Sequence, residues 1–169
     1  DIFIRYREFY SSRKQLLETL RKLPKVFTHN DAWAPNLFLQ KDGSVIAVDW
    51  SFTGIVGVGE ELGRFYGLCL HSGLGTTIDI NGLSGILFDS YCLGLFEAGW
   101  KGDIRLVRFG FTASVGIRCG MLIPKIMDHF YRNKEDVNLT EQIQGRAKVA
   151  SHLLELAEEA ISLCRNLEL

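Results

Sequence analysis

The sequence has no long run of basic residues, so nothing in its charge pattern favours nucleic-acid binding. It also has no closely spaced cysteine pair of the kind that binds zinc or forms a redox motif, because its cysteines are far apart along the chain. We therefore interpret them as reduced, mostly buried thiols. The four are Cys69, Cys92, Cys119 and Cys164.

The apolar stretches of the sequence are short. Charged residues interrupt them before they reach the roughly 18 residues that cross a bilayer, as Asp89 and Glu97 do between Ile86 and Trp100. We therefore expect no membrane span and a cytoplasmic protein. The chain begins at Asp1 with neither an initiator methionine nor a signal-like segment. This beginning predicts a fragment of a longer protein.

The composition is that of an ordinary globular domain. The 169 residues are 47% apolar and 23% charged, with a formal net charge of −1. A chain of this length and composition can bury one hydrophobic core, so we expect a single domain over residues 1–169. Nothing in the composition indicates an oligomeric state.

Helical periodicity dominates the chain. Between residues 2 and 23, apolar residues recur at intervals of three and four, and Pro24 ends this predicted amphipathic helix. Strand patterns occur at 26–28 and in the two arms of a hairpin, and they become weak beyond Trp50. The prediction is an α+β fold that is mostly α, with further helices at 59–72, 83–99, 103–131 and 139–167.

Two apolar arms flank Asp42-Gly43 within Leu37–Trp50, which is a strong hairpin signal. A two-residue turn there would pair Asn36 with Asp49 across the hairpin. Apolar side chains would then share one face, which we expect to pack against a core. A three-residue turn with a bulge would shift this register by one residue. The residues of the expected apolar face are Leu37, Leu39, Ile46 and Val48.

An amide oxygen and a carboxylate side by side are a poor zinc site but a suitable partial shell for Mg²⁺. This ion keeps some of its waters and takes further ligands from substrate phosphates. Asn36 and Asp49 are therefore the candidate metal ligands. Asp31, in the loop that enters the hairpin, is positioned to accept a proton from an alcohol that attacks a phosphorus atom.

Residues 29–36 and 48–50 resemble the catalytic loop and metal-binding segment of the aminoglycoside phosphotransferase and choline kinase family, whose members are related to protein kinases. The family pattern is H-G-D-x-x-x-x-N, followed by a hydrophobic residue, Asp and Trp or Phe. The resemblance covers residues 26–64 specifically and the helical remainder in general character. It implies that Asp31 is the catalytic base and that Asn36 and Asp49 hold magnesium.

Two positions depart from the family pattern. Asn30 stands where the family usually has Gly, and it tolerates a positive φ less well than Gly does. Glu61 stands where an Asp that supports the site is expected. Phosphoryl transfer stays possible with Asn30 and Glu61 at these positions, but the sequence does not determine the geometry of the loop around them.

Enzymes of this kind hold ATP between two lobes and use a glycine-rich loop and a strand lysine from the amino-terminal lobe. Neither element is found in these 169 residues. The resemblance therefore implies a carboxy-terminal lobe without its amino-terminal partner, with ATP as donor and a small-molecule hydroxyl as acceptor. We expect the isolated chain to transfer phosphate very slowly or not at all.

In the resembled family the acceptor docks on the helices that follow the metal segment, here residues 60–135. Acidic residues in this range would attract a cationic acceptor, although acids are also common on plain surface. Aminoglycosides, choline-like amines, amino alcohols and sugars all stay open as acceptors. The acidic residues are Glu60, Glu61, Asp89, Asp103 and Asp128.

Simpler interpretations exist for the same residues. Asp31, Asn36 and Asp49, taken singly, are residues that commonly cap loops and strand ends. We expect His29 to orient the catalytic loop rather than to react, and we expect Trp33 to pack around that loop. We expect the same of Trp50. No role is assigned to His71, His129 or His152, which have no partners at metal-ligand spacing.

Two other functional classes stay open. Gly57–Gly63 resembles a dinucleotide-binding fingerprint, but six residues separate it from the preceding strand and no convincing second strand follows. The other class is a kinase-like lobe retained for binding without catalysis. Metal affinity that depends on Asp49 would distinguish the catalytic lobe from such a module.

Overall fold

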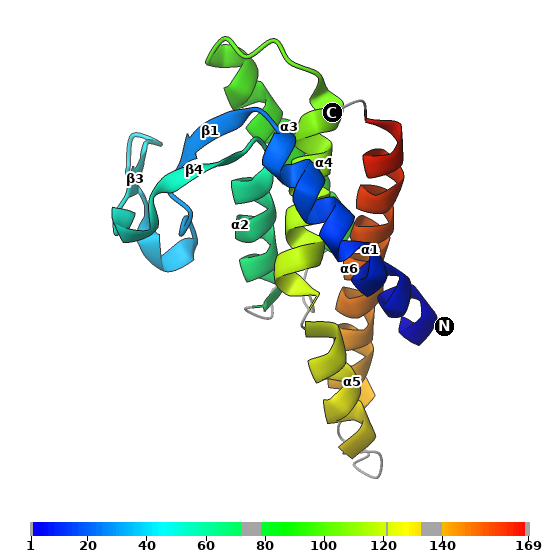
Figure 1. The fold of residues 1–169 in the computed structure, drawn as a ribbon. Helices are drawn as coiled ribbons and strands as arrows, with labels where there is room; N and C mark the ends of the chain where they lie inside the picture. The colour runs from blue at the N-terminus through cyan, green and yellow to red at the C-terminus, as the bar shows by residue number, and fades with distance from the viewer. Residues whose placement is uncertain (1, 72–78, 121, 133–139, 168–169) are drawn as a thin grey trace.

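The computed structural model describes residues 2–71, 79–120, 122–132 and 140–167 (Figure 1). Its described elements confirm the prediction of an α+β fold that is mostly α. In chain order they are α1 Ile2–Lys22, β1 Lys25–Thr28, the 3-10 turn η1 Ala34–Asn36, β2 Leu37–Leu39, β3 Val45–Ala47, the 3-10 turn η2 Trp50–Phe52, β4 Gly54–Gly57, α2 Glu60–His71, α3 Ile80–Glu97, α4 Ile104–Cys119, α5 Leu122–Arg132 and α6 Thr140–Asn166.

The predicted helix over 103–131 is two helices, and the prediction of one continuous helix was wrong. α4 ends at Cys119, and α5 begins at Leu122. Pro124 explains the break, because a proline ring clashes with the carbonyl four residues earlier, here that of Gly120, and is tolerated only in the first turn of a helix. Apolar periodicity continues across the break, which is why the sequence pattern hides it.

Four strands form two separate antiparallel pairs. β1 pairs with β4, from Lys25 opposite Gly57 to Thr28 opposite Gly54, and β2 pairs with β3. The sequence did not predict β4, because Gly54–Gly57 contains only two apolar residues and its pairing partner lies far back in the chain. Figure 1 shows both pairs on one side of the helical body, away from α6.

The predicted two-residue turn of the hairpin is wrong, and the three-residue alternative is confirmed. Gln40 N–H donates to the carbonyl of Ser44 over 2.8 Å, which leaves a three-residue loop that ends at Gly43 with φ 86°. The register therefore places Leu37 opposite Ala47 and Leu39 opposite Val45. Asn36 now lies opposite Val48 instead of Asp49, and Val48 N–H donates to the Asn36 carbonyl over 3.0 Å.

The apolar face expected to pack against a core does not do so. The new register separates its members, since Leu37 and Leu39 share one face of the hairpin while Ile46 and Val48 lie on the other. Both faces are open to solvent: Leu39 is 75% exposed and Phe38 is 50% exposed. Within the described residues, the hairpin is therefore an exposed apolar surface.

The hydrophobic core is built around α4. Most of this helix is buried, including Val107, Phe109, Phe111 and Val115, and it packs against both α2 and α6. A helix that is apolar on all sides belongs inside a protein. The stretch Ile104–Lys125 is long and apolar enough to cross a membrane by composition, and 71% of its apolar window is buried inside the protein. Such burial is typical of a core helix, while the cytoplasmic location stays a prediction.

The cysteines agree with their sequence interpretation. Cys92 and Cys119 are buried, and Cys69 and Cys164 are partly buried. All four are free thiols. Burial raises the pKa of Cys119 to about 11, so this thiol stays neutral at physiological pH.

The loop between β4 and α2 lies directly on the backbone of α4. A Cβ atom at Gly110 would come within 1.9 Å of the Val58 carbonyl oxygen, and one at Gly59 within 2.2 Å of the Val107 carbonyl oxygen. Gly59 also has φ 85°, a conformation that favours glycine. Two glycines therefore let α4 hold the beginning of α2 in place.

Gly110→Ala is expected to destabilise the protein by about 1–3 kcal/mol, because the added methyl group forces α4 and the Val58 loop apart. Urea denaturation measures the change. Gly85→Ala is the matched control, since Gly85 is an exposed interior position of α3 with nothing within 4 Å of an added Cβ. The control should stabilise the protein by about 0.5–1 kcal/mol, and equal effects of the two substitutions would contradict the close approach.

His152 on α6 is a core histidine. Tyr66 Oη donates to the Ile80 carbonyl over 2.8 Å, so its oxygen accepts the proton of His152 Nε2 over 2.7 Å. Nδ1 is then unprotonated, buried and without a hydrogen-bond partner. Burial lowers the pKa of His152 below its ordinary value, and the nearby Glu155 carboxylate opposes this only in part.

A histidine whose pKa is lower in the folded state favours folding above its unfolded pKa of about 6.5 and loses this contribution as the pH falls below that value. We expect the unfolding free energy of the wild type to decrease between about pH 7.5 and about pH 5 more than that of His152→Gln. Glutamine keeps a donor for Tyr66 and does not titrate. Parallel pH profiles of the two proteins, measured by urea denaturation, would contradict this assignment.

Candidate functional site

The loop from His29 to Asn36 connects β1 to the hairpin, and His29 attaches it to the hairpin's second strand. The side chain is 5% exposed. Its Nδ1 accepts the Asp31 backbone N–H over 3.2 Å, so the ring proton is on Nε2, which donates to the Val48 carbonyl over 2.8 Å. The His29 imidazole thus connects the backbone of Asp31, the candidate base, to that of Val48, the residue before Asp49. Such contacts are compatible with a role in orienting the loop.

Asn30 adopts the conformation that usually belongs to glycine, with φ 60°. Its backbone N–H donates to Glu61 Oε1 over 2.7 Å. Asparagine is one of the few residues other than glycine that enter this region readily. Asn30 and Glu61, the two residues that differ from the resembled pattern, are therefore hydrogen-bonded to each other, and Glu61 of α2 supports the loop.

The Asp31 carboxylate is partly buried and has a partner on each oxygen. Oδ1 accepts a hydrogen bond from Arg64 Nη2 over 2.8 Å, and Oδ2 accepts one from Asn36 Nδ2 over 3.0 Å. The Arg64 guanidinium also lies 5.9 Å from the centre of the Phe52 ring. An ionised carboxylate has about four lone-pair sites, so both oxygens can still accept another proton donor.

The sequence interpretation did not identify Arg64. A signal was present, because residues three apart on a helix lie on the same face and Arg64 follows Glu61 by three. Because Glu61 contacts the loop, Arg64 on the same face of α2 lies beside the loop as well.

Asn36 presents its oxygen away from Asp31. Its Nδ2 group donates both to the Asp31 carbonyl, over 2.9 Å, and to the Asp31 carboxylate. The Oδ1 atom makes no hydrogen bond to any described residue. This amide oxygen is therefore a free acceptor beside the candidate base.

Asp49 lies at the end of the hairpin in the left-handed region, with φ 61° and ψ 67°. Its carboxylate is exposed and accepts a hydrogen bond from Ser51 Oγ. Left-handed backbone is uncommon in residues other than glycine and often occurs at functional sites. Asp49 thus presents an accessible carboxylate one residue beyond Val48, the backbone partner of both His29 and Asn36.

Of the three predicted residues, the structure brings Asp31 and Asn36 into direct contact. Asp31 and Asn36 are directly hydrogen-bonded, and Asp49 follows Val48 in the opposite strand. Within the described residues no three His, Cys, Asp or Glu side chains gather as a metal cluster. The donors present are one amide oxygen and one exposed carboxylate, which fit Mg²⁺ with its waters and substrate phosphates better than a transition metal.

Trp50 packs beside this loop. Its ring centre lies 4.5 Å from that of His29 and 6.3 Å from that of Phe27, and its Nε1 donates to the Ala47 carbonyl over 2.9 Å. It covers the imidazole that holds the loop. The tryptophan at position 33 contributes its carbonyl, which accepts the Asn36 N–H over 2.8 Å.

The glycines that imitate a dinucleotide fingerprint have another explanation. Gly57 ends β4, which is antiparallel to β1, and no two described strands are parallel. Gly59 and Gly63 allow close approach to the backbone of α4. A dinucleotide site requires a parallel βαβ unit, so the described strands argue against this alternative.

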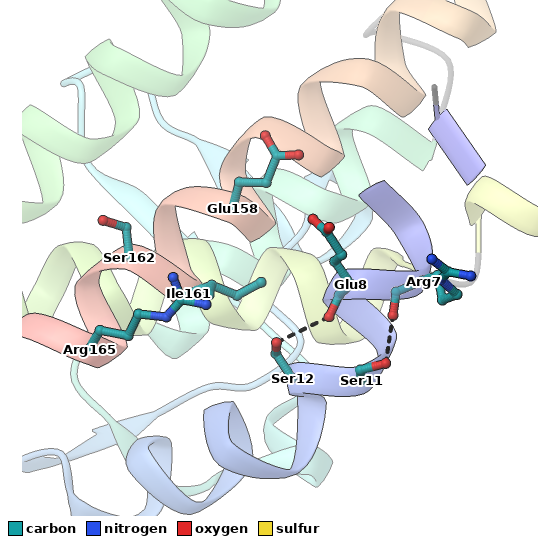
Figure 2. Close-up of a pocket in the computed structure, with 8 residues that line it drawn as sticks. All are labelled: Arg7, Glu8, Ser11, Ser12, Glu158, Ile161, Ser162 and Arg165. Atoms are coloured by element: carbon teal, nitrogen blue, oxygen red, sulfur yellow. Dashed lines mark hydrogen bonds between the residues drawn. The ribbon is translucent and has the colours of Figure 1, made fainter. Parts of the chain in front are cut away.

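Two of the cavities that adjoin the described helices have volumes of about 400 Å³ or more. One, of about 400 Å³, lies between α2, α4 and α5 and includes Arg64 in its lining. The other, of about 640 Å³, lies between α1 and α6 (Figure 2). Figure 2 shows that Ser11 and Ser12 donate back to the carbonyls of Arg7 and Glu8 on their own helix. This second cavity contains none of the predicted site residues.

His71 and His152 make no described contact with Asp31, Asn36 or Asp49. His152 belongs to the core, and His71 is an exposed residue at the end of α2. The side chain of His129 lies outside the described part of the structure.

Comparisons with known proteins identify no relative of this chain: no family model, no curated protein and no solved structure matches it. The case for a function therefore depends on the geometry of the site and on the chemistry of its residues.

Glu61→Ala is expected to loosen the loop from His29 to Asn36, because it removes a hydrogen bond to a charged acceptor that is worth about 1.5–3 kcal/mol. Amide hydrogen exchange should become at least about tenfold faster at Asn30 and Asp31, while the amides of α4 keep their protection. Glu61→Gln is the matched control, since its amide oxygen can accept the same N–H. Unchanged exchange at Asn30 in the alanine variant would show that Glu61 does not hold the loop.

Proposed function

We propose that this chain is the catalytic lobe of a Mg²⁺-dependent phosphotransferase that moves the γ-phosphoryl group of ATP to a hydroxyl group of a small molecule. The observation that supports it most is the placement of Asn36. Its amide nitrogen donates to the Asp31 carboxylate, and its oxygen makes no hydrogen bond to any described residue. Phosphoryl transfer to an alcohol needs a base that orients the hydroxyl and a metal ion that neutralises charge on the phosphates.

In this proposal Asp31 holds the acceptor. The acceptor hydroxyl donates its hydrogen bond to the carboxylate, and the proton passes to Asp31 as the oxygen attacks the γ-phosphorus and the bond to the leaving ADP oxygen breaks. Arg64 and Asn36 keep the carboxylate in one orientation throughout. Asn36 Oδ1 and Asp49 would hold Mg²⁺, which supplies charge neutralisation at the phosphates.

The exposed hairpin provides a surface for the nucleotide. Phe38 and Ile46 lie opposite each other, on the same face of the hairpin as Asn36 and Val48. Exposed apolar patches next to a polar site are typical of binding surfaces. We propose that the base of ATP and an amino-terminal nucleotide-binding lobe cover this surface in the complete enzyme.

Mg²⁺ titration of the chain, followed by calorimetry and by amide NMR, tests the metal site. Asp49→Ala is expected to weaken Mg²⁺ binding by at least about tenfold, which corresponds to about 1.4 kcal/mol. Asp42→Ala is the matched control, because Asp42 is also exposed in the hairpin and also accepts a hydrogen bond from the serine two residues later. Equal effects of the two variants, or no Mg²⁺ binding by the wild type, would refute the site.

The same experiment extends to catalysis in any form of the protein that transfers phosphate from ATP. There Asp31→Asn should lower kcat at least about 100-fold and leave Mg²⁺ affinity within about threefold of the wild type. If Mg²⁺ binding depended on Asp49 but Asp31→Asn left kcat unchanged, Asp31 would not be the catalytic base, and the chain would be a metal-binding module without it.

A further inference from the structure

The cavity between α2, α4 and α5 adjoins the candidate base. Arg64, which lines it, donates to Asp31 over 2.8 Å, so a molecule in the cavity contacts the residue that holds the base. Its volume of about 400 Å³ is within the range of small-molecule sites. The lining consists of Arg64, Gly67, Leu68, His71, Arg118, Cys119, Leu122 and Lys125.

The charge of this lining has one sign. Arg64, Arg118 and Lys125 are cations, and no carboxylate of the described residues lines the cavity. Arg118 donates from Nε to Ser114 Oγ over 3.3 Å. No carboxylate among the described residues pairs with Arg118 or Lys125. Cations that line one cavity attract an anion, and guanidinium groups bind carboxylate and phosphate in two-pronged geometry.

The rest of the lining is neutral. Gly67 and Leu68 of α2 and Leu122 of α5 provide apolar contacts. Cys119 stays a neutral thiol, because burial raises its pKa to about 11. The cavity therefore combines an anion-binding wall with an apolar floor.

Four of the five acids that would attract a cationic acceptor have other partners, Asp89 being the exception among the described residues. Glu60 Oε1 accepts the Gly57 N–H, and Glu61 accepts that of Asn30. Asp103 caps α4 and pairs with Arg105, and Asp128 pairs with Arg132. None of these carboxylates lines the cavity, so nothing there selects an amine.

We propose that the acceptor of the phosphoryl group is a hydroxyl compound that carries an acidic group, carboxylate or phosphate, which Arg118 and Lys125 bind in this cavity. The inference depends on the proposed function, since it assigns the substrate class of the same site. Arg64 lies between the two parts, with its guanidinium on Asp31 and its side chain in the cavity wall. The acidic group anchors the molecule while its hydroxyl approaches Asp31.

Binding to the whole chain tests this assignment, with glycerate as the carboxylate probe, glycerol phosphate as the phosphate probe and ethanolamine as the cationic probe. At least one anionic probe should bind more tightly than ethanolamine and should shift the side-chain NMR signals of Arg64 and Arg118. Arg118→Gln and Lys125→Gln should each weaken that binding about tenfold. The stronger of the two anionic probes identifies the acidic group.

Arg132→Gln is the matched control, because it removes the same charge from α5 at an exposed position that does not line the cavity. It should change the affinity by less than about twofold. If Arg132→Gln and Lys125→Gln weakened binding of the anionic probe equally, the probe would be attracted by the overall charge and not by the cavity, and the inference would be overturned. Tighter binding of ethanolamine than of either anionic probe would also overturn it.

Mg²⁺ titration of the same samples separates the two proposals. Mg²⁺ binding that depends on Asp49, without anion binding in the cavity, overturns the acceptor assignment and leaves the proposed function standing. Anion binding that depends on Arg118, without any Mg²⁺ binding, refutes the proposed function and the acceptor assignment with it.

Discussion

The candidate site depends on the two hydrogen bonds of one buried imidazole. His29 accepts the Asp31 N–H on one ring nitrogen and donates from the other to the Val48 carbonyl. The first bond fixes the turn that presents the Asp31 carboxylate, and the second fixes the strand that leads into Asp49. A neutral ring in one tautomer meets both demands, and Trp50 covers it. These two hydrogen bonds therefore fix the position of the loop, and of the Asp31 side chain, relative to the hairpin.

The helical body supplies the second constraint. α2 begins where the loop Val58-Gly59 lies on the backbone of α4, and the first turns of α2 then contact the loop from His29 to Asn36 through Glu61 and Arg64. Because α4 is buried between α2 and α6, a displacement of α2 would disturb the whole core. The site is thus held from the β side by His29 and from the helical side by Glu61 and Arg64 of α2.

The distribution of charge gives the site two sides. The exposed carboxylate of Asp49 and the free oxygen of Asn36 attract a cation, whereas Arg118 and Lys125 attract an anion on the other side of Arg64. Asp31 lies between these sides, with its own charge balanced by Arg64. Such a gradient suits a reaction in which a metal-bound phosphate and an anionic acceptor must approach each other without repulsion.

The sequence by itself determined the local features of this protein. Apolar periodicity was sufficient for the positions of most helices, Pro24 for the end of the first, and Asp42-Gly43 for the existence of a hairpin. The closeness of Asp31 and Asn36 also followed from the sequence, because the two residues are only five positions apart in the loop that enters the hairpin.

Only the tertiary structure decided the features that depend on contacts between distant residues. The one-residue shift of the hairpin, the pairing of β4 with β1 and the Arg64 bond to Asp31 each join segments whose approach no local pattern encodes. The division of the predicted helix at Gly120 also escaped the pattern, because apolar periodicity persists across it. The cationic cavity is the clearest case, since its residues come from three helices and gather only when α4 is enclosed by the core. A side chain's neighbours along the chain are set by spacing, whereas its neighbours across the fold are set by which surfaces bury each other.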